Sequence, residues 1–170
     1  VRVEADITRC GDDLLAEHIS QLQSLEGKVH ILAGGPPCQG FSFAGKRRES
    51  DPRNLLFEKY VQVVDAIKPS ALVLENVPGM KVAHTSKEGD REQEDHATES
   101  FYEKLKRSLE SIGYEVLGKI IDASGFGVPQ KRSRLIVIGL RKNLADNLSG
   151  GIGRAFEILE TKRKEQLAEL

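Results

Sequence analysis

Short apolar runs alternate with longer amphipathic stretches along the chain. The runs that are short enough for strands cover residues 29–33, 71–75, 114–121 and 135–140. Glycine and proline follow the first run at 34–37 and the second at 78–79, as expected where a strand gives way to a loop. The pattern therefore predicts four strands, of which the last is the most apolar.

Apolar residues at helical spacing predict helices between these strands. One stripe, which should end before Pro69, comprises Leu56, Tyr60, Val63, Val64 and Ile67. A second stripe, which Gly113 should cap, comprises Phe101, Leu105, Leu109 and Ile112. An earlier helix is indicated by Leu15, Ile19 and Leu22, and an exposed final helix by the charged segment from about residue 154.

This alternation of helices with strands that are apolar throughout favours an α/β fold with a largely parallel sheet. Residues 122–134 join the last two strands and lack a helical period, so antiparallel pairing of those two strands is the alternative. Residues 81–100 are polar and should form a mobile surface insertion.

Composition narrows the classes of protein. The 170 residues suffice for one domain, or two at most, and the first residue is Val, so we expect a fragment of a longer chain. A net charge of −1 excludes a strongly basic nucleic-acid-binding tail but allows a local basic patch. No apolar run reaches the ~20 residues of a membrane span, and the first residues do not read as a secretory signal. The two cysteines, Cys10 and Cys38, favour a reducing compartment.

The loop after the first predicted strand carries the first candidate for chemistry, Cys38. It lies in Gly-Gly-Pro-Pro-Cys-Gln-Gly-Phe-Ser at residues 34–42. Ligands of open α/β sheets bind beyond the carboxyl ends of strands, and a cysteine that loses its proton there is a strong nucleophile. A buried structural thiol is the usual alternative for a lone cysteine. The Pro-Pro-Cys-Gln setting favours the nucleophile.

Two further polar segments lie at predicted strand ends. Glu75 and Asn76 close the second strand, and they share a sheet edge with Cys38 if the two strands are neighbours. Arg132 and Arg134 lead into the fourth strand within Gly-Val-Pro-Gln-Lys-Arg-Ser-Arg at 127–134. We expect these arginines to point to opposite sides, one toward a pocket and one toward a partner. A surface carboxylate and a solvated basic turn are the alternatives.

In this order and at these strand ends, the three segments resemble motifs of the C5-cytosine DNA methyltransferases. The resemblance covers residues 4 to about 143 and includes Asp6 and Ile7, which look like the segment beside the cofactor adenine. Residues 42–56 resemble the family's mobile catalytic loop. The implied fold is the catalytic half of an S-adenosylmethionine-dependent, Rossmann-like methyltransferase sheet, with its first strands missing. It would span residues 1–150, and residues 151–170 would form a linker and an exposed helix leading towards an absent recognition region.

The resemblance implies a role for each candidate residue. Cys38 adds to C6 of cytosine, so that C5 can take a methyl group from S-adenosylmethionine. A protonated Glu75 donates to N3 and Arg134 donates to O2, while the base that removes the C5 proton is not identified. Cofactor contacts are implied for Asp6, Ile7, Pro37 and Leu56. Contacts to DNA are implied for Gln39, Ser42, Lys46, Arg53, Asn76 and Arg132. No metal is implied.

The implied partner is double-stranded DNA with its target cytosine flipped out of the helix, because the base cannot be reached inside a duplex. The family's glycine-rich cofactor loop and its ribose-binding acidic residue are missing, so the strand at 29–33 should present an open edge. We therefore expect the chain alone to be unstable or inactive unless the missing part or a complementing polypeptide is supplied.

Other functions remain open at this point. A transfer-RNA cytosine-5 methyltransferase shares the three motifs, and a non-catalytic nucleic-acid-binding remnant or a general nucleotide-binding domain would share the fold. By resemblance to the family, the compact motif spacing implies a bacterial modification enzyme of a restriction-modification system. We accordingly expect a cytoplasmic location without a membrane partner, or a nuclear one if the source is eukaryotic.

Overall fold

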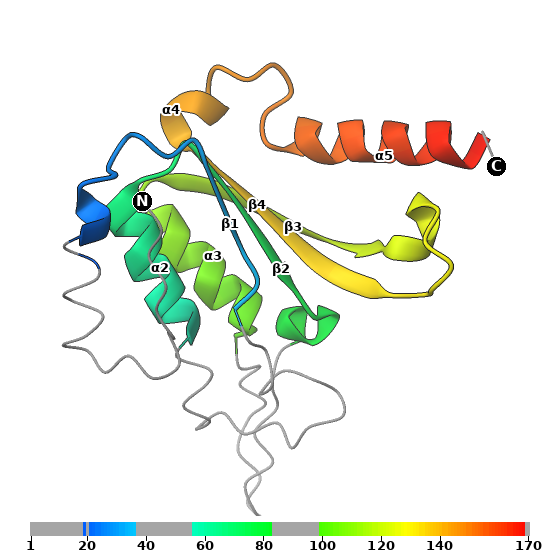
Figure 1. Cartoon of the computed structure of the whole chain (residues 1–170), viewed down its shortest axis with the longest axis horizontal. Coiled ribbons are helices and arrows are strands. Elements are labelled where there is room, and N and C mark those ends of the chain that lie inside the picture. The colour runs from blue at the N-terminus through cyan, green and yellow to red at the C-terminus, as the bar shows by residue number, and fades with distance from the viewer. Residues whose placement is uncertain (1–18, 20, 37–55, 83–98, 169–170) are drawn as a thin grey trace, which may run out of the picture.

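The computed structural model describes residues 19, 21–36, 56–82 and 99–168 (Figure 1). Within these ranges a four-stranded sheet is formed by β1 (Ile31–Gly34), β2 (Ala71–Asn76), β3 (Tyr114–Asp122) and β4 (Ser133–Arg141). The helices are α2 (Leu56–Ile67), α3 (Phe101–Ser111), α4 (Lys142–Ala145) and α5 (Gly153–Ala168), with short 3-10 turns η2 (Pro78–Lys81) and η3 (Ala123–Phe126). The four predicted strands and the three later helices are confirmed. Of the predicted early helix, residues 21–23 are helical and the part before residue 19 lies outside the described residues.

The strand order is β1-β2-β4-β3, and this corrects one prediction. Among the described strands only β1 and β2 pair in parallel, whereas β4 is antiparallel to both β2 and β3, so the sheet is not largely parallel. The reason is the short connection from β3 to β4. A parallel pair needs a crossover of about a dozen or more residues that packs on the sheet, whereas residues 123–132 hold only one 3-10 turn, so the chain returns antiparallel. The antiparallel alternative for the last two strands is confirmed.

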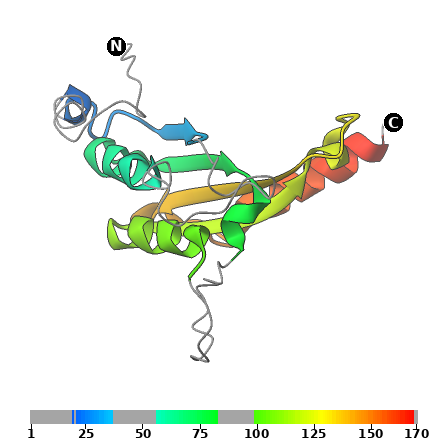
Figure 2. The same ribbon diagram turned by 90° about the horizontal axis from the view of Figure 1, so that it is seen from below.

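Helices α2 and α3 cover one face of the sheet, and α5 lies away from them along the β3–β4 end (Figures 1 and 2). Alternate residues of β2 and β4 point into the core beneath α2 and α3, where Leu72, Leu74, Leu135 and Val137 are 0% exposed. Val64, Leu105 and Leu109 from the two helices are also 0% exposed. The apolar stripes predicted for these helices therefore face the sheet.

The helix ends follow the local sequence. Helix α2 stops at Ile67, before Pro69, and Lys68 takes the left-handed conformation at φ 48°. The side chain of Ser100 caps α3 by accepting a hydrogen bond from the Glu103 N–H at 3.3 Å. At the other end Ile112 occupies the cap position, and Gly113 supplies the positive φ, 93°, that follows it.

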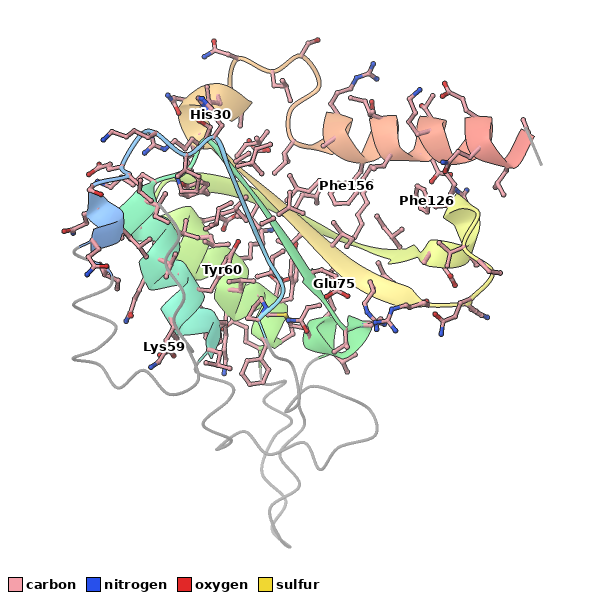
Figure 3. All side chains as sticks on the ribbon, viewed as in Figure 1. His30, Lys59, Tyr60, Glu75, Phe126 and Phe156 are labelled. Atoms are coloured by element: carbon pink, nitrogen blue, oxygen red, sulfur yellow. The ribbon has the colours of Figure 1, made fainter. Side chains whose placement is uncertain are left out.

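Two peripheral features bear on the predictions. β1 is an edge strand among the described strands, and its Ile31 side chain is 65% exposed, as predicted for an open edge. Helix α5 is mostly exposed, but Phe156 is 4% exposed and its ring lies 5.1 Å from the Lys119 ammonium (Figure 3).

Most of the predicted insertion, residues 83–98, lies outside the described residues. No helix in the described ranges is long and apolar enough to cross a membrane.

Candidate active site

The carboxyl ends of β1 and β2 lie side by side. The two strands pair in register from Ile31↔Ala71 to Gly34↔Leu74. A Cβ atom added to Gly35 would lie 3.5 Å from Oε2 of Glu75, so the chain leaving β1 passes directly over this carboxylate. The expected neighbouring of the two strands is confirmed. Cys38 itself, two residues beyond Pro36, lies outside the described residues.

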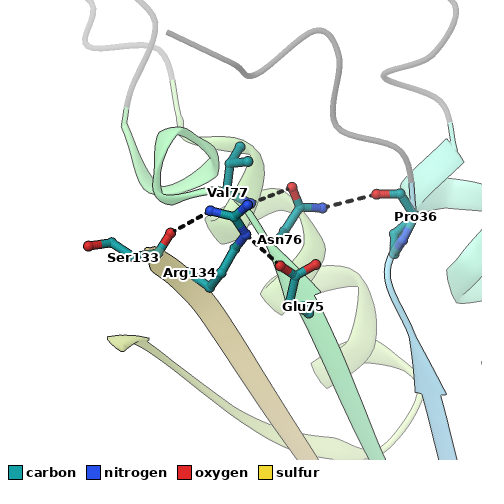
Figure 4. Close-up of polar contacts among 6 residues, drawn as sticks. All are labelled: Pro36, Glu75, Asn76, Val77, Ser133 and Arg134. Atoms are coloured by element: carbon teal, nitrogen blue, oxygen red, sulfur yellow. Dashed lines mark hydrogen bonds and ion pairs between the residues drawn. The ribbon is translucent and has the colours of Figure 1, made fainter. Parts of the chain in front are cut away.

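Glu75 is held by Arg134, which comes from the adjacent strand β4. Nε of Arg134 forms an ion pair with Oε1 of Glu75 at 2.7 Å, and its Nη1 donates to the main-chain carbonyl of Ser133 at 2.8 Å (Figure 4). The Glu75 side chain is 50% exposed and that of Arg134 is 25% exposed. The structure thus brings together two of the three predicted catalytic residues and leaves the carboxylate accessible to a ligand.

Asn76 is buried beside this pair, with 2% of the residue exposed. Its Nδ2 donates to the Pro36 carbonyl at 3.3 Å, and its Oδ1 accepts from the Val77 N–H at 2.8 Å (Figure 4). Both ends of the amide are therefore used by main chain, which does not favour the direct DNA contact predicted for this residue. The geometry instead favours a brace between the exits of β1 and β2.

Arg132 and Arg134 line the same groove. This groove has a volume of about 750 Å³ and is otherwise walled largely by apolar side chains of β2, β4 and α5, including Val73, Ile136, Ile138 and Ile158. The expectation that the two arginines face opposite sides is wrong. They are two residues apart, and in extended backbone that spacing places side chains on the same face.

Asp122, at the end of β3, is a residue that the sequence analysis missed. Its Oδ1 accepts hydrogen bonds from the N–H and the hydroxyl of Ser124, at 3.0 and 2.9 Å, and from the Arg132 N–H at 3.2 Å. These hydrogen bonds, led by that from the Ser124 N–H, hold the pKa of Asp122 below its usual value. An Asp two residues before a Ser at a strand end is a turn and cap signal, and it could have been found.

Tyr60 of α2 packs against the end of β1 from the helix-covered side (Figure 3). A Cβ on Gly34 would approach its ring to 3.0 Å, so any larger residue here would require the ring to shift by a few tenths of an ångström. The Tyr60 hydroxyl is buried without a hydrogen-bond partner, and desolvation raises its pKa to about 12. One turn earlier, Leu56 is 5% exposed at the start of the same helix. The cofactor contact predicted for Leu56 stays a prediction.

The other predicted contacts fall outside the described residues. These are Asp6, Ile7, Pro37, Gln39, Ser42, Lys46 and Arg53. Among the residues that the structure describes, no three side chains of the metal-binding types cluster.

The chain is similar in sequence to known DNA methyltransferases. The family model for C-5 cytosine-specific DNA methylases matches residues 6–170. The chain is 41% identical over 140 residues to the Type II methyltransferase M1.HphI of Haemophilus parahaemolyticus, covering 81% of this chain and 33% of that protein. It is 38% identical over 147 residues to the DNA (cytosine-5-)-methyltransferase M.ApeKI of Aeropyrum pernix, covering 78% of this chain and 30% of that protein.

A solved structure gives the same picture. The crystal structure of a putative DNA modification methyltransferase encoded within a prophage of E. coli superposes with a TM-score of 0.53 and 26% identity. The match covers 84% of this chain and 34% of that one. The chain thus spans about a third of the length of the relatives it matches.

Proposed function

Because the chain belongs to the C-5 cytosine-specific DNA methylase family, we propose that it carries the catalytic centre of an enzyme that transfers a methyl group from S-adenosylmethionine to C5 of cytosine in double-stranded DNA. The observation that supports this most directly is the Glu75–Arg134 pair at 2.7 Å. The pair lies at the ends of β2 and β4, beside the exit of β1 from which the Pro-Pro-Cys-Gln loop departs, so a carboxyl and a guanidinium border the start of that loop.

The chemistry begins with the thiolate of Cys38. Its attack on C6 of cytosine forms a carbon–sulfur bond and moves the ring electrons toward N3, where a proton donor lowers the barrier. Glu75, carrying a proton, donates to N3, and the resulting enamine makes C5 nucleophilic. S-adenosylmethionine, when bound, would supply the electrophilic methyl group to C5 and leave as S-adenosylhomocysteine. A base then removes the C5 proton, the C5–C6 double bond re-forms as the Cys38 thiolate leaves, and N3 returns its proton to Glu75.

Three of the described residues have separate supporting roles in this mechanism. Arg134 donates to O2 of the target cytosine. Before the cytosine binds, its ion pair with Glu75 holds that carboxylate in position. Asn76 fixes the start of the Cys38 loop through the Pro36 carbonyl, at 3.3 Å, rather than by touching DNA. Arg132, in the same groove, positions the loop or the DNA backbone.

Residues outside the described ranges complete the proposed site. Gln39, Ser42, Lys46 and Arg53 would close over DNA phosphates around a flipped cytosine. Asp6, Ile7 and Pro37, together with Leu56, would border the cofactor. Residues 1–150 would form the central part of the catalytic domain, and residues 151–170 would lead towards a recognition region supplied by a longer or complementing polypeptide. The complete enzyme would be a bacterial, cytoplasmic methyltransferase of a restriction-modification system.

Methyl transfer to oligonucleotides tests the proposal. The full chain, and a chimera in which it replaces the matching residues of M1.HphI, are incubated with labelled S-adenosylmethionine and either duplex DNA or an RNA hairpin. From the chimera we expect 5-methylcytosine in DNA, and none when it carries Cys38→Ser. Methylation of RNA alone would instead identify an RNA methyltransferase. A folded chimera that binds the cofactor but methylates neither would contradict the proposal.

A further inference from the structure

The carboxylate of Asp122 joins both ends of the β3–β4 connection. Asp122 and Ser133 form the last pair of the ladder, with Ile121 and Arg134 next to them. Beyond this last pair, Oδ1 of Asp122 accepts the Arg132 N–H at 3.2 Å and the Ser124 N–H at 3.0 Å. One side chain thus binds the residue that leaves β3 and the residue that enters β4.

Together with the Ala123 N–H, which donates to the Arg132 carbonyl at 3.0 Å, this arrangement supports the register of β4 where the ladder ends beside Arg134. A slip of one residue in a strand moves every side chain to the opposite face. Arg134 would then point to the helix-covered face, away from Glu75. The Arg132 N–H can reach Asp122 only when Ser133 stands opposite it, so this hydrogen bond opposes the slip.

Asp122 also lies one contact away from the guanidinium itself. Its Oδ2 accepts from the Ser133 hydroxyl at 3.5 Å, and the carbonyl of the same serine accepts from Nη1 of Arg134 at 2.8 Å. Two routes, through the N–H of Arg132 and through Ser133, therefore lead from this carboxylate to the Arg134 side chain. Neither route passes through the core between the sheet and the two helices.

We propose that Asp122 is a positioning residue for the methyl-transfer site, holding the β3–β4 connection so that Arg134 meets Glu75. This proposal rests on the proposed function, because that function gives the Glu75–Arg134 pair its role in methyl transfer. Asp122 touches neither substrate nor cofactor. It acts by closing a turn whose loosening would let the guanidinium leave the carboxylate.

The Nε–Hε resonance of Arg134 reports its pairing with Glu75 without any need for activity. In a ¹H–¹⁵N spectrum of the full chain this resonance is assigned by its loss in Arg134→Lys, and its unpaired position is read from Glu75→Ala, which removes the acceptor oxygen. We expect Asp122→Ala to move it to the unpaired position. Asp122→Asn keeps the Oδ1 acceptor and should leave it in place. Asp146→Ala, which removes an exposed carboxylate of α4's cap, should also leave it in place.

An unmoved resonance in folded Asp122→Ala would overturn the proposal. If that variant does not fold, Asp122→Glu keeps the charge but displaces the acceptor, and an unmoved resonance there overturns it equally. In the methyl-transfer assay, Asp122→Ala should lower kcat ~10- to 100-fold with an unchanged KM for S-adenosylmethionine, because small misplacements of reacting groups cost rates of this size. Equal losses in Asp122→Asn would also overturn it. A folded M1.HphI chimera that carries the wild-type sequence, binds the cofactor and shows no transferase activity refutes the proposed function, while the resonance still decides the role of Asp122.

Discussion

The two faces of the sheet are built for different purposes from the same strands. On the face under α2 and α3, Leu72, Leu74 and Val137 are 0% exposed and form the core. On the other face, Val73 and Ile136 line an open groove together with Glu75. Because side chains alternate along a strand, neighbouring residues of β2 serve stability and chemistry in turn.

This difference separates what a substitution changes. Removing a side chain from the helix-covered face leaves a cavity in a packed interior, which lowers the free energy of unfolding. Removing one from the open face disturbs a half-exposed ion pair, which contributes little to stability. Effects on stability and on reaction rate should therefore segregate by face, and each prediction below tests that separation.

The largest effect is expected for Glu75→Gln on the open face. The amide cannot donate the proton that N3 requires, so methyl transfer should fall by ~10²- to 10⁴-fold. The free energy of unfolding should change by about 1 kcal/mol or less, because the Glu75 side chain is 50% exposed. Single-turnover rates and urea unfolding of the same variant check both parts. If Glu75→Gln were so destabilised that unfolding explained the lower rate of methyl transfer, the proposed difference between the two faces would be contradicted.

Leu72→Ala on the covered face should show the reverse. The side chain is 0% exposed, so the substitution should lower the free energy of unfolding by about 2–5 kcal/mol. Val73→Ala, its neighbour on the groove, is the matched control and should cost about 1 kcal/mol or less. Urea unfolding with unchanged m-values measures both. Equal costs for the two variants would mean that the groove face is also packed.

Alkaline pH should weaken the covered face through Tyr60. The hydroxyl keeps its proton to about pH 12 in the folded protein, against 10 in the unfolded chain. The folded state therefore binds more protons between these values, and stability is lost as pH rises through that window, by on the order of 2–3 kcal/mol. Tyr60→Phe should lose less stability than wild type between pH 10 and 12.

Tyr102→Phe is the control for that experiment. The Tyr102 hydroxyl accepts the Gly118 N–H at 2.9 Å, so its removal leaves a buried donor unpaired and should cost about 1–3 kcal/mol at neutral pH. Tyr60→Phe breaks no hydrogen bond and should cost almost nothing there. The pH dependence of thermal unfolding for the three proteins separates these effects. An identical alkaline slope in wild type and Tyr60→Phe would contradict the assignment.

The smallest effect is expected at the end of α2. Lys68 holds φ 48°, a conformation that costs a side-chain-bearing residue about 1 kcal/mol or more and costs glycine almost nothing. Lys68→Gly removes this strain but also removes the exposed ion pair with Glu26, at 2.6 Å. We expect an increase in the melting temperature of a few degrees. A lower melting temperature would show that the ion pair outweighs the strain.

Several features were predictable because they depend on local pattern. The apolar stripe from Leu56 to Ile67 predicts α2, and Pro69 predicts its end. The family, predicted from three short motifs at strand ends, is confirmed. The pairing of Glu75 with Arg134 agrees with the shared site that the motifs imply. Residue type and position at a strand end carry this information.

Other features depend on contacts between distant segments. Nothing local in residues 133–141 shows that β4 inserts between β2 and β3, since an apolar run fits any central position in a sheet. Asn76 reads as a polar residue at a strand end, and only its distance to Pro36 shows that both amide ends are used internally. Asp122 was passed over because its importance comes from Arg132, ten residues later in the chain.

Trapping of the covalent adduct tests the central claim most directly. A DNA duplex with 5-fluorocytosine at the target base blocks the final elimination, because the C5 fluorine cannot leave as a proton does. With S-adenosylmethionine and the M1.HphI chimera, we predict a stable protein–DNA adduct on the peptide that contains Cys38, located by mass spectrometry. The yield should be unchanged in Val73→Ala and strongly reduced in Glu75→Gln. An adduct at another residue, or one formed equally in Glu75→Gln, would contradict the account.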